Sequence, residues 1–504
     1  MRRLLFCLAA AALSLAAATK PKLIVTVVVD QFRYDYLTRF RGEYKGGFNR
    51  LLTRGAVFTN ARYMHAPAVT AVGHSTVLSG AIPSISGIVA NDWYDYEEHG
   101  HVTSVSDAAT RLVGGQGQGS SPHRLLVSTV GDEMKFAAPA THIIGISLKD
   151  RASILPSGHA ADAAYWFDPA SGNFVTSTFY VQDLPQWARA FNDGRPADQY
   201  KGVTWQGHTL AAQGPKLYAG LEATPYGNEL IERFAERALE GEQLGRHAST
   251  DLLTVSFSSN DYVGHQYGPE SPEAHDISLR TDALLGKLLD AVDRQVGAEN
   301  ALIVFTADHG APPTPEANHG RKMPGGRIPP AAIREAVSNA ITKRWGAGEW
   351  IAGTYDLSVY LNRDLIAQKG LKLGEVEAEA ADAVAAMPHI FRVYTLERVS
   401  HGETLRDEIT QRVVNGFNLR RGPDLEVIPE PYWFVSGGSS GISHALPFGY
   451  DVHVPVIFLG AGIRAGRYNQ TILVNDIAPT LATMLDIETP AGSVGRVLDE
   501  ILLP

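Results

Sequence analysis

The stretch Leu23-Ile24-Val25-Thr26-Val27-Val28-Val29-Asp30 is a continuous run of apolar and β-branched residues that ends in a carboxylate. Such a run predicts a strand that is buried on both faces of a sheet. Further strand-like runs cover residues 143–148, 252–258, 302–307 and 454–459. Helical spacing and composition predict helices over 47–53, 273–296, 374–387 and 476–486. This alternation indicates an α/β fold with helices on both faces of a central sheet.

Acidic residues and histidines follow or border these strand-like runs. The set is Asp30, Asp261, His265, Asp308, His309 and His444. Because open α/β sheets bind ligands at the carboxyl ends of their strands, we expect these side chains to converge. Burying three carboxylates together without cations would be costly. Three aspartates and three histidines are the ligand complement of two zinc-like ions, so the set predicts a two-metal hydrolase.

Two pairs in this set have informative spacing. Asp261 and His265 are four residues apart, which places both on one face of a helical turn. Asp308 and His309 are adjacent and precede Gly310, where the chain can turn sharply. Each pair alone is more typical of a surface turn than of a metal site. The prediction therefore rests on the complete set.

A helix-compatible stretch with small residues opens near Thr70, in Pro67-Ala68-Val69-Thr70-Ala71-Val72-Gly73-His74-Ser75-Thr76. A hydroxyl at a helix start meets free N–H groups and the positive end of the helix dipole. Thr70 is therefore the predicted nucleophile, activated by a metal. Two alternatives stay open: Thr70 as a simple helix cap, or Ser75 or Thr76 as the reacting hydroxyl.

The composition limits the size of the hydrophobic core and the kinds of partner that the chain can bind. The chain has 504 residues, 44% of them hydrophobic, which suffices for one large core or two smaller ones. Without residues 1–18, 42 basic and 54 acidic side chains remain, a net charge of about −12. This balance argues against a nucleic-acid partner, which usually requires a basic face. A compact phosphate is compatible with it, because metal ions and a few local cations can offset the field.

Residues 1–18 have the pattern of a secretory signal sequence. A basic Arg2-Arg3 pair precedes an apolar stretch from Leu4 to Leu15, and Ala16-Ala17-Ala18 fits a cleavage site. The only cysteine, Cys7, lies inside this segment, so the mature chain needs no disulfide and has no thiolate ligand. The alternative, an N-terminal anchor helix, is disfavoured because the apolar stretch is short for a membrane span. We predict a periplasmic or secreted protein that has no membrane attachment after cleavage.

Two stretches interrupt the alternation of strands and helices. Residues 160–225 are rich in Trp, Tyr, Gly and Pro, and residues 311–435 begin with a Pro-rich loop and contain a basic cluster. Each follows closely after candidate site residues. We predict that both are insertions that cap the site of a single catalytic domain over residues 19–504. The alternative is a separate second domain.

The ordered set of candidate residues resembles the alkaline phosphatase superfamily. In chain order it reads Asp30, Thr70, Asn91, Lys149/Arg151, Asp261-x-x-x-His265, Asp308-His309 and His444. The chain is similar to the phosphate-irrepressible, Thr-dependent alkaline phosphatases of bacterial periplasms, close kin of the nucleotide pyrophosphatase/phosphodiesterases. The resemblance spans nearly the whole mature chain, including Val474-Asn475-Asp476-Ile477-Ala478-Pro479-Thr480. It implies an alkaline-phosphatase-like central sheet with helices on both faces and capping insertions.

The resemblance also implies a role for each residue. One zinc ion would be held by Asp261, His265 and His444, and the second by Asp30, Asp308 and His309, with Thr70 bound to the second. Asn91 would donate to a phosphoryl oxygen, and Lys149 and Arg151 match the Lys-x-Arg pair of the family's monoesterases. Two cations on one loop also suit the extra negative charge that a monoester carries over a diester. The alternative for Lys149 and Arg151 is a solvated loop pair.

These roles predict a phosphomonoesterase with two zinc ions per chain. Thr70 attacks phosphorus in line, a phospho-threonine intermediate forms, and water then hydrolyses it. The main alternative is a phosphodiesterase or nucleotide pyrophosphatase of the same superfamily. A sulfatase is disfavoured because Thr70-Ala71-Val72-Gly73-His74 offers no Cys or Ser for formylglycine. A binding protein on a degenerate scaffold would show gaps among the ligands, and there are none.

The expected partners are small phosphate monoesters rather than nucleic acid or membranes. The sequence leaves open the physiological substrate, the oligomeric state and any residual diesterase activity. It also leaves open whether manganese or iron replaces zinc, because Asp/His sites accept several divalent metals.

Overall fold

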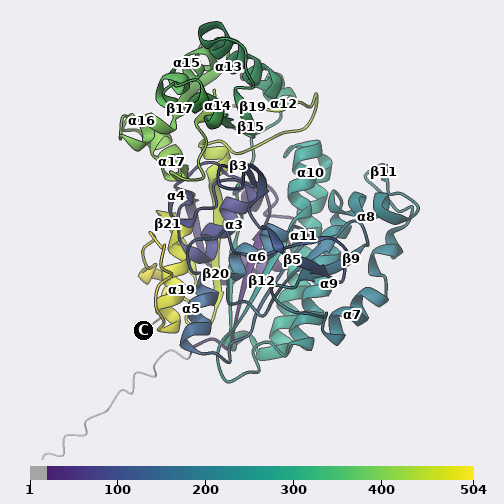
Figure 1. Cartoon of the computed structure of the whole chain (residues 1–504). Helices are drawn as coiled ribbons and strands as arrows, with labels where there is room; N and C mark the ends of the chain where they lie inside the picture. The colour runs from purple at the N-terminus through teal and green to yellow at the C-terminus, as the bar shows by residue number, and fades with distance from the viewer. Residues whose placement is uncertain (1–19, 504) are drawn as a thin grey trace, which may run out of the picture.

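The computed structural model describes residues 20–503, so the predicted signal sequence lies outside the described residues. Its largest element is an 11-stranded sheet with the strand order β21-β2-β20-β13-β1-β12-β7-β8-β9-β5-β6 (Figure 1). The strands β5 (Ser106–Val113) and β6 (Gln118–Ser120) form one end of this sheet. The α/β fold predicted from the alternation of strands and helices is thereby confirmed.

The centre of the sheet is parallel. Its strands are β1 (Leu23–Val29), β12 (Asp251–Phe257), β13 (Ala301–Thr306), β7 (Ile143–Ser147) and β8 (Ala163–Asp168). β1 pairs with β12 on one side and with β13 on the other, and both pairings are parallel. Every residue of these three strands is buried. This burial on both faces explains why their sequences are continuous apolar runs rather than alternating ones.

One side of the sheet is mixed. β20 (His453–Gly460) pairs antiparallel with β13 and with β2 (Ala56–Arg62), and β21 (Gly466–Leu473) pairs parallel with β2. Because Thr306 pairs with Val456, the beginning of β20 lies beside the end of β13. A residue that precedes β20 can therefore reach the same edge of the sheet as residues that follow β1, β12 and β13.

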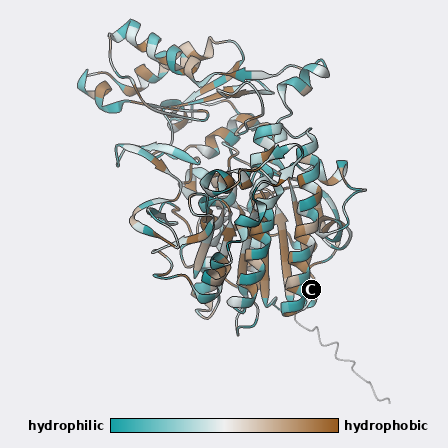
Figure 2. Cartoon of the chain, turned by 90° about the vertical axis from the view of Figure 1, so that its right-hand side faces the viewer, coloured by the Kyte–Doolittle hydropathy of each residue, from teal (hydrophilic) through white to brown (hydrophobic). Residues whose placement is uncertain are grey.

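Helices cover both faces of the sheet, and the strands form a brown apolar layer between them (Figure 2). One group that packs together is α2 (Gly47–Arg54), α9 (Pro225–Gly241) and α11 (Pro272–Val296). The other group is α3 (Thr70–Ser79), α5 (Val130–Ala137), α6 (Asp150–Ser157) and α19 (Ile477–Leu485). The groups lie on opposite faces because right-handed crossovers that run in opposite directions along a sheet place their helices on opposite sides.

Residues 315–435 form a small lobe above the edge of the sheet, drawn in green in Figure 1. Its four-stranded sheet has the order β15 (Ile351–Tyr355), β16 (Ser358–Leu361), β18 (Leu425–Pro429) and β17 (Ile390–Thr395). The helices α13 (Pro330–Trp345) and α15 (Leu373–Ala385) cover this sheet and share a hydrophobic core with it.

The other aromatic-rich stretch, residues 160–225, divides between two structures. Its first part forms β8 and β9 (Asn173–Ser177), which extend the central sheet. Its second part forms α7 (Gln186–Asp193) and α8 (Gly214–Glu222), which pack against α9. The beginning of this stretch is therefore part of the main core rather than an addition to it.

Candidate metal centre

The six predicted ligands lie at one edge of the central sheet, beneath the small lobe. Asp30 directly follows β1 and Asp308 follows β13, while α10 (Ser259–Tyr267) carries Asp261 and His265 directly after β12. His444 reaches the same edge because β20 runs antiparallel to β13. The carboxyl ends of parallel strands thus bring together residues that are hundreds of positions apart in the chain.

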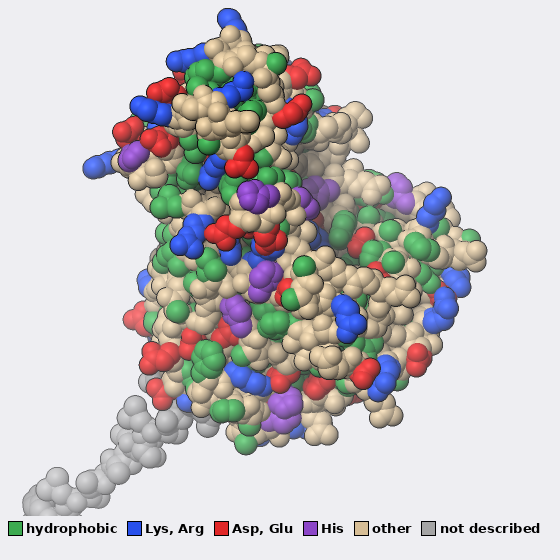
Figure 3. Space-filling model, viewed as in Figure 1, with side chains coloured by type: hydrophobic (Ala, Val, Ile, Leu, Met, Phe, Trp, Pro, Cys, Tyr) green, Lys and Arg blue, Asp and Glu red, His purple; other side chains and the backbone are tan. Residues whose placement is uncertain are grey.

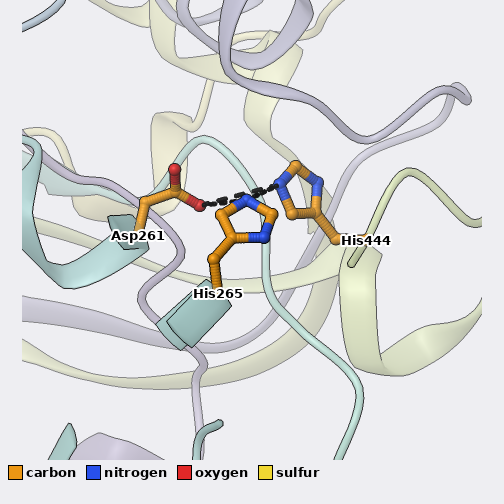
Figure 4. Close-up of side chains that lie close together, drawn as sticks. All are labelled: Asp261, His265 and His444. Carbon is orange, nitrogen blue, oxygen red and sulfur yellow. Dashed lines mark hydrogen bonds and ion pairs between the residues drawn. The ribbon is translucent and has the colours of Figure 1, made fainter. Parts of the chain in front are cut away.

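Asp261, His265 and His444 form the first cluster (Figure 4). The Nε2 atom of His265 lies 3.2 Å from Asp261 Oδ1 and 3.1 Å from His444 Nε2. His444 Nε2 lies 3.6 Å from the same Asp261 oxygen. One carboxylate oxygen and two imidazole nitrogens therefore face a common point, as three ligands of one zinc ion would.

Asp30, Asp308 and His309 form a second cluster, and all three side chains are fully buried. His309 Nε2 lies 3.4 Å from Asp30 Oδ1 and 3.5 Å from Asp308 Oδ2. Asp261 lies between the two clusters, because its carboxylate is also within 4.8 Å of ligand atoms of Asp30 and His309. The two clusters are thus adjacent, as a two-metal site requires.

The three imidazoles are oriented by hydrogen bonds to backbone carbonyls. Nδ1 of His265 donates to the carbonyl of Ile442 at 2.9 Å, and Nδ1 of His444 donates to that of Ala68 at 2.7 Å. Nδ1 of His309 donates to the carbonyl of Gly310 at 2.9 Å. Since each Nδ1 carries a proton, the neutral form of each ring presents the lone pair of Nε2 to a metal.

The buried atoms of the second cluster fit a metal as well. Among the described residues, Asp30 Oδ1, Asp308 Oδ2 and His309 Nε2 are buried and have no hydrogen-bond partner. Buried polar atoms are almost always paired, and a cation would satisfy all three at once. Nitrogen and carboxylate ligands without a thiolate are compatible with zinc.

Burial and neighbouring charges shift the pKa values of the candidate ligands in both clusters. Burial raises the pKa of Asp30, and the negative charges of Asp261 and Asp308 raise it further. Burial also opposes ionisation of Asp261, but His265 and Lys149 outweigh it and hold the pKa of Asp261 well below its ordinary value. Burial and the neighbouring His309 lower the pKa of His444 to about 3, so this imidazole is neutral. At the other two imidazoles burial disfavours the charged form, but neighbouring carboxylates outweigh it: Asp261 raises the pKa of His265, and Asp308 and Asp30 raise that of His309 to about 10. A metal ion at these nitrogens would displace the protons, because a histidine ligand must be neutral.

Thr70 is the first residue of α3 and is 1% exposed. The Oδ1 atom of Asn91 accepts a hydrogen bond of 2.9 Å from the backbone N–H of Ala71, so Asn91 lies at the same helix start. This bond orients the Asn91 side chain and leaves its Nδ2 group available as a donor. The rival hydroxyls of Ser75 and Thr76 both donate to the carbonyl of Val72 inside the helix.

Lys149 lies two residues after the end of the strand β7 and is 4% exposed. Its ammonium group lies 3.3 Å from Thr70 Oγ1, 2.5 Å from Asp30 Oδ2 and 2.6 Å from Asp261 Oδ2. These two carboxylates raise the pKa of Lys149 against the opposing effect of burial, so it is a cation. Lys149 immediately precedes the helix α6, of which Arg151 is the second residue, and 28% of the Arg151 side chain is exposed.

The structure adds five residues that the sequence pattern did not single out. The backbone N–H of Gln31 donates to Asp308 Oδ1 at 3.0 Å, and its side-chain amide donates to Asp261 Oδ1 at 2.6 Å. The His74 ring bridges the Thr70 carbonyl and the Ser256 hydroxyl, at 2.8 Å each. The Lys149 ammonium lies 4.9 Å from the centre of the Tyr262 ring, whose hydroxyl approaches Glu222 at 3.5 Å. Only Gln31 had a possible signal, because it directly follows Asp30.

The surface around the site is rich in titratable groups. In Figure 3, histidine and acidic side chains gather on the face where the small lobe meets the body. Within residues 20–503, no helix combines the length and the apolar character that a membrane span requires.

Comparisons with known proteins agree with this geometry. Residues 24–445 match the family model described as type I phosphodiesterase / nucleotide pyrophosphatase. Alkaline phosphatase PafA of Elizabethkingia meningoseptica is 35% identical, over 96% of this chain and 95% of that protein. Alkaline phosphatase PhoV of Synechococcus elongatus is 33% identical, over 96% and 93%. The crystal structure of wild-type PafA matches with a TM-score of 0.90 at 34% identity, covering 97% of this chain and 100% of that one.

These matches confirm the family resemblance and the fold predicted from the ordered motifs. The alignment with PafA covers nearly the full length of both chains. The chain belongs to the type I phosphodiesterase/nucleotide pyrophosphatase family and has the alkaline-phosphatase-like fold of its full-length relatives.

Proposed function

We propose that this protein is an alkaline phosphatase that hydrolyses phosphate monoesters through Thr70 at a two-zinc site. The observation that carries the proposal is the position of Lys149. Its ammonium group lies beside the Thr70 hydroxyl and, at the same time, beside two of the candidate metal ligands. A cation at this place adds positive charge where the phosphoryl group would be transferred.

The residues of the chain would divide the reaction among them. Bound zinc ions would favour the ionised form of the Thr70 hydroxyl and offset charge on the leaving oxygen. Thr70 Oγ1 forms a bond to phosphorus as the bond to the leaving alcohol breaks, which gives a phospho-threonine. Water then cleaves the bond between Thr70 and phosphorus, and inorganic phosphate leaves. Asn91 Nδ2 and Lys149 would bind the equatorial phosphoryl oxygens, where charge accumulates.

The charge of the site favours monoesters over diesters. A monoester presents one more anionic oxygen than a diester, and Lys149 and Arg151 would supply two cations for it. The family model is named for phosphodiesterases, but PafA and PhoV, which align over nearly the whole chain, are named alkaline phosphatases. Diesterase activity is therefore the less favoured alternative.

We further propose that the protein is exported. The support is the signal-like pattern of residues 1–18 and the absence of any cysteine after Cys7. N-terminal sequencing of the exported protein should begin near Thr19. An intact Met1-Arg2 terminus on a cytoplasmic product would contradict this proposal.

The test of the function combines metal analysis with kinetics on matched substrates. The purified protein is expected to contain about two zinc ions per chain, to lose activity to a chelator and to regain it with zinc. With an aryl monoester and the corresponding methyl diester, kcat/KM should favour the monoester by several orders of magnitude. Active protein without a transition metal would contradict the metal site, and a preference for the diester would favour the phosphodiesterase alternative.

A further inference from the structure

The helix α17 (Glu408–Gly416) belongs to the small lobe but packs against the segment that leads to Thr70. In Figure 1 it lies at the lower border of that lobe. Residues Arg412, Asn415 and Gly416 share one face of α17, because positions three and four apart in a helix are neighbours. All three contact the segment 63–67, which ends three residues before Thr70.

This face of α17 is held to the backbone of the segment 63–67 by short hydrogen bonds and by close packing. The backbone N–H of Ala66 donates to the Arg412 carbonyl at 2.9 Å, and Asn415 Nδ2 donates to the carbonyl of Met64 at 2.6 Å. Gly416 lies so close to the Ala66 carbonyl that a Cβ atom there would overlap the oxygen. Arg412 and Asn415 are each 7% exposed, so water cannot readily replace these bonds.

The guanidinium group of Arg412 also contacts a second segment of the site. Its Nη1 atom donates to the carbonyl of Pro447 at 2.9 Å, and its Nε atom donates to that of Tyr63 at 3.4 Å. Glu408, one turn earlier on α17, pairs with Nη2. Arg412 therefore links the segment that precedes Thr70 to the segment that follows His444.

These two segments are joined a second time, next to the reacting groups. His444 Nδ1 donates to the carbonyl of Ala68 at 2.7 Å, and the backbone N–H of Ala68 donates to the Ala445 carbonyl at 3.3 Å. Ala68 is two residues before Thr70 in the chain. Any shift of the segment 63–67 is thus transmitted both to the nucleophile and to the ring orientation of His444.

We propose that Arg412 and Asn415 are positioning residues through which the small lobe sets the relative placement of Thr70 and His444. The inference rests on the proposed role of Thr70 and of the metal centre. Removing either side chain leaves buried carbonyls without a donor and releases one of the two segments. A mutation far from the reacting atoms that misplaces them by about 1 Å can lower a rate by about 100-fold. We therefore expect kcat to fall by about 10- to 100-fold.

The experiment compares Arg412→Ala, Arg412→Lys and Asn415→Ala in the full-length enzyme at saturating zinc. Arg406→Ala is the matched control, because Arg406 is exposed and lies just before α17. Both alanine variants should lose kcat by about 10- to 100-fold while KM changes little. The loss should be equal for a monoester and a diester, because Thr70 and His444 would serve both. Guanidinium ions should restore part of the activity of Arg412→Ala but not that of Asn415→Ala, and Arg412→Lys should be intermediate.

Three results would overturn the proposal. They are wild-type kcat in folded Arg412→Ala, a fall in the zinc content of either alanine variant that matches its loss of kcat, and a lower Tm without a change in kcat. If Arg412→Ala does not fold, Asn415→Ala decides, since it removes a single donor. Failure of the proposed function can be told apart from failure of this inference. A wild-type enzyme that prefers diesters would contradict the proposed function, but the variants would still lose equal fractions of both rates if Arg412 and Asn415 are positioning residues.

Discussion

At the scale of single residues, the hydroxyl of Thr70 is the smallest feature on which the proposed chemistry depends. Thr70→Ala should lower kcat by about a thousand-fold or more, because a hydrolase without its nucleophile retains only binding and electrostatic contributions. Thr70→Ser should keep substantial activity, since it preserves the hydroxyl. Zinc content and Tm should remain close to those of the wild-type protein in both variants. Near wild-type turnover by Thr70→Ala would transfer the role to another group, such as water.

Also at the scale of single residues, we expect Lys149 and Arg151 to determine the preference for phosphate monoesters over diesters. Each well-placed donor to a transition-state charge contributes about 2.7–4 kcal/mol. The double change Lys149→Ala with Arg151→Ala should therefore lower kcat/KM for a monoester by about a thousand-fold or more, while diester turnover changes far less. Metal content must be measured alongside, because Lys149 also contacts Asp30 and Asp261. An equal loss on both esters would mean that the pair is structural.

At the scale of elements, α3 must approach the end of β13 very closely, and Gly73 permits this. Gly73 lies one turn after Thr70, and a Cβ atom there would overlap the backbone carbonyl of Asp308. Gly73→Ala should push α3 away from β13 and separate Thr70 from Asp308. We expect a loss of about 1–3 kcal/mol of stability, typical of overpacking, together with a large loss of kcat. Thermal melting and kinetics check this.

The control for Gly73→Ala is Gly42→Ala, because no atom lies within 4 Å of a Cβ atom built at Gly42. Gly42→Ala should leave activity and Tm essentially unchanged. If Gly73→Ala behaves in the same way, the close approach of α3 to β13 does not determine the geometry of the site.

At the scale of the whole molecule, a buried carboxyl in the small lobe couples stability to pH. Glu426 on β18 is 4% exposed, and its Oε2 atom accepts a hydrogen bond from Ser358 at 2.7 Å. Burial raises the pKa of Glu426 from 4.5 to about 7. The folded state therefore retains this proton up to about pH 7, whereas the unfolded chain releases it near pH 4.5. The stability that Glu426 contributes is complete below pH 4.5 and is lost as the pH rises to about 7.

Glu426→Gln should remove this loss, because an amide has no proton to release in this range. Its Tm should match that of the wild-type protein near pH 4.5 and exceed it above pH 7. The corresponding difference in the free energy of unfolding is on the order of 3 kcal/mol at most. Thermal melting between pH 4.5 and 9 is the measurement. Glu403→Gln, at an exposed position, should show no pH-dependent difference. Equal Tm values for Glu426→Gln and the wild type at alkaline pH would contradict the prediction.

The sequence by itself determined the fold class and the candidate ligands, because both depend on residue type at particular positions. A strand buried on both faces must be apolar along its length, as β1 is, and polar residues directly after it must lie at the sheet edge. Asp30, Asp261 and Asp308 could therefore be assigned to one edge without coordinates. The direction of β20, which brings His444 to that edge, has no comparable signal. It depends on pairing with β13 far away in the chain.

Only the tertiary structure decided how the site is held in place. The histidine rings are oriented by the carbonyls of Ala68, Gly310 and Ile442. The side chains of α17 likewise bind backbone carbonyls of the segment that precedes Thr70. Every residue has a carbonyl group, so no residue type marks the ones that act as acceptors. The charge of Lys149 is visible in the sequence, but its contact with Thr70 arises only when β7 and α3 meet at the sheet edge. The chemistry is thus encoded by side-chain identity, and its geometry by non-local backbone contacts.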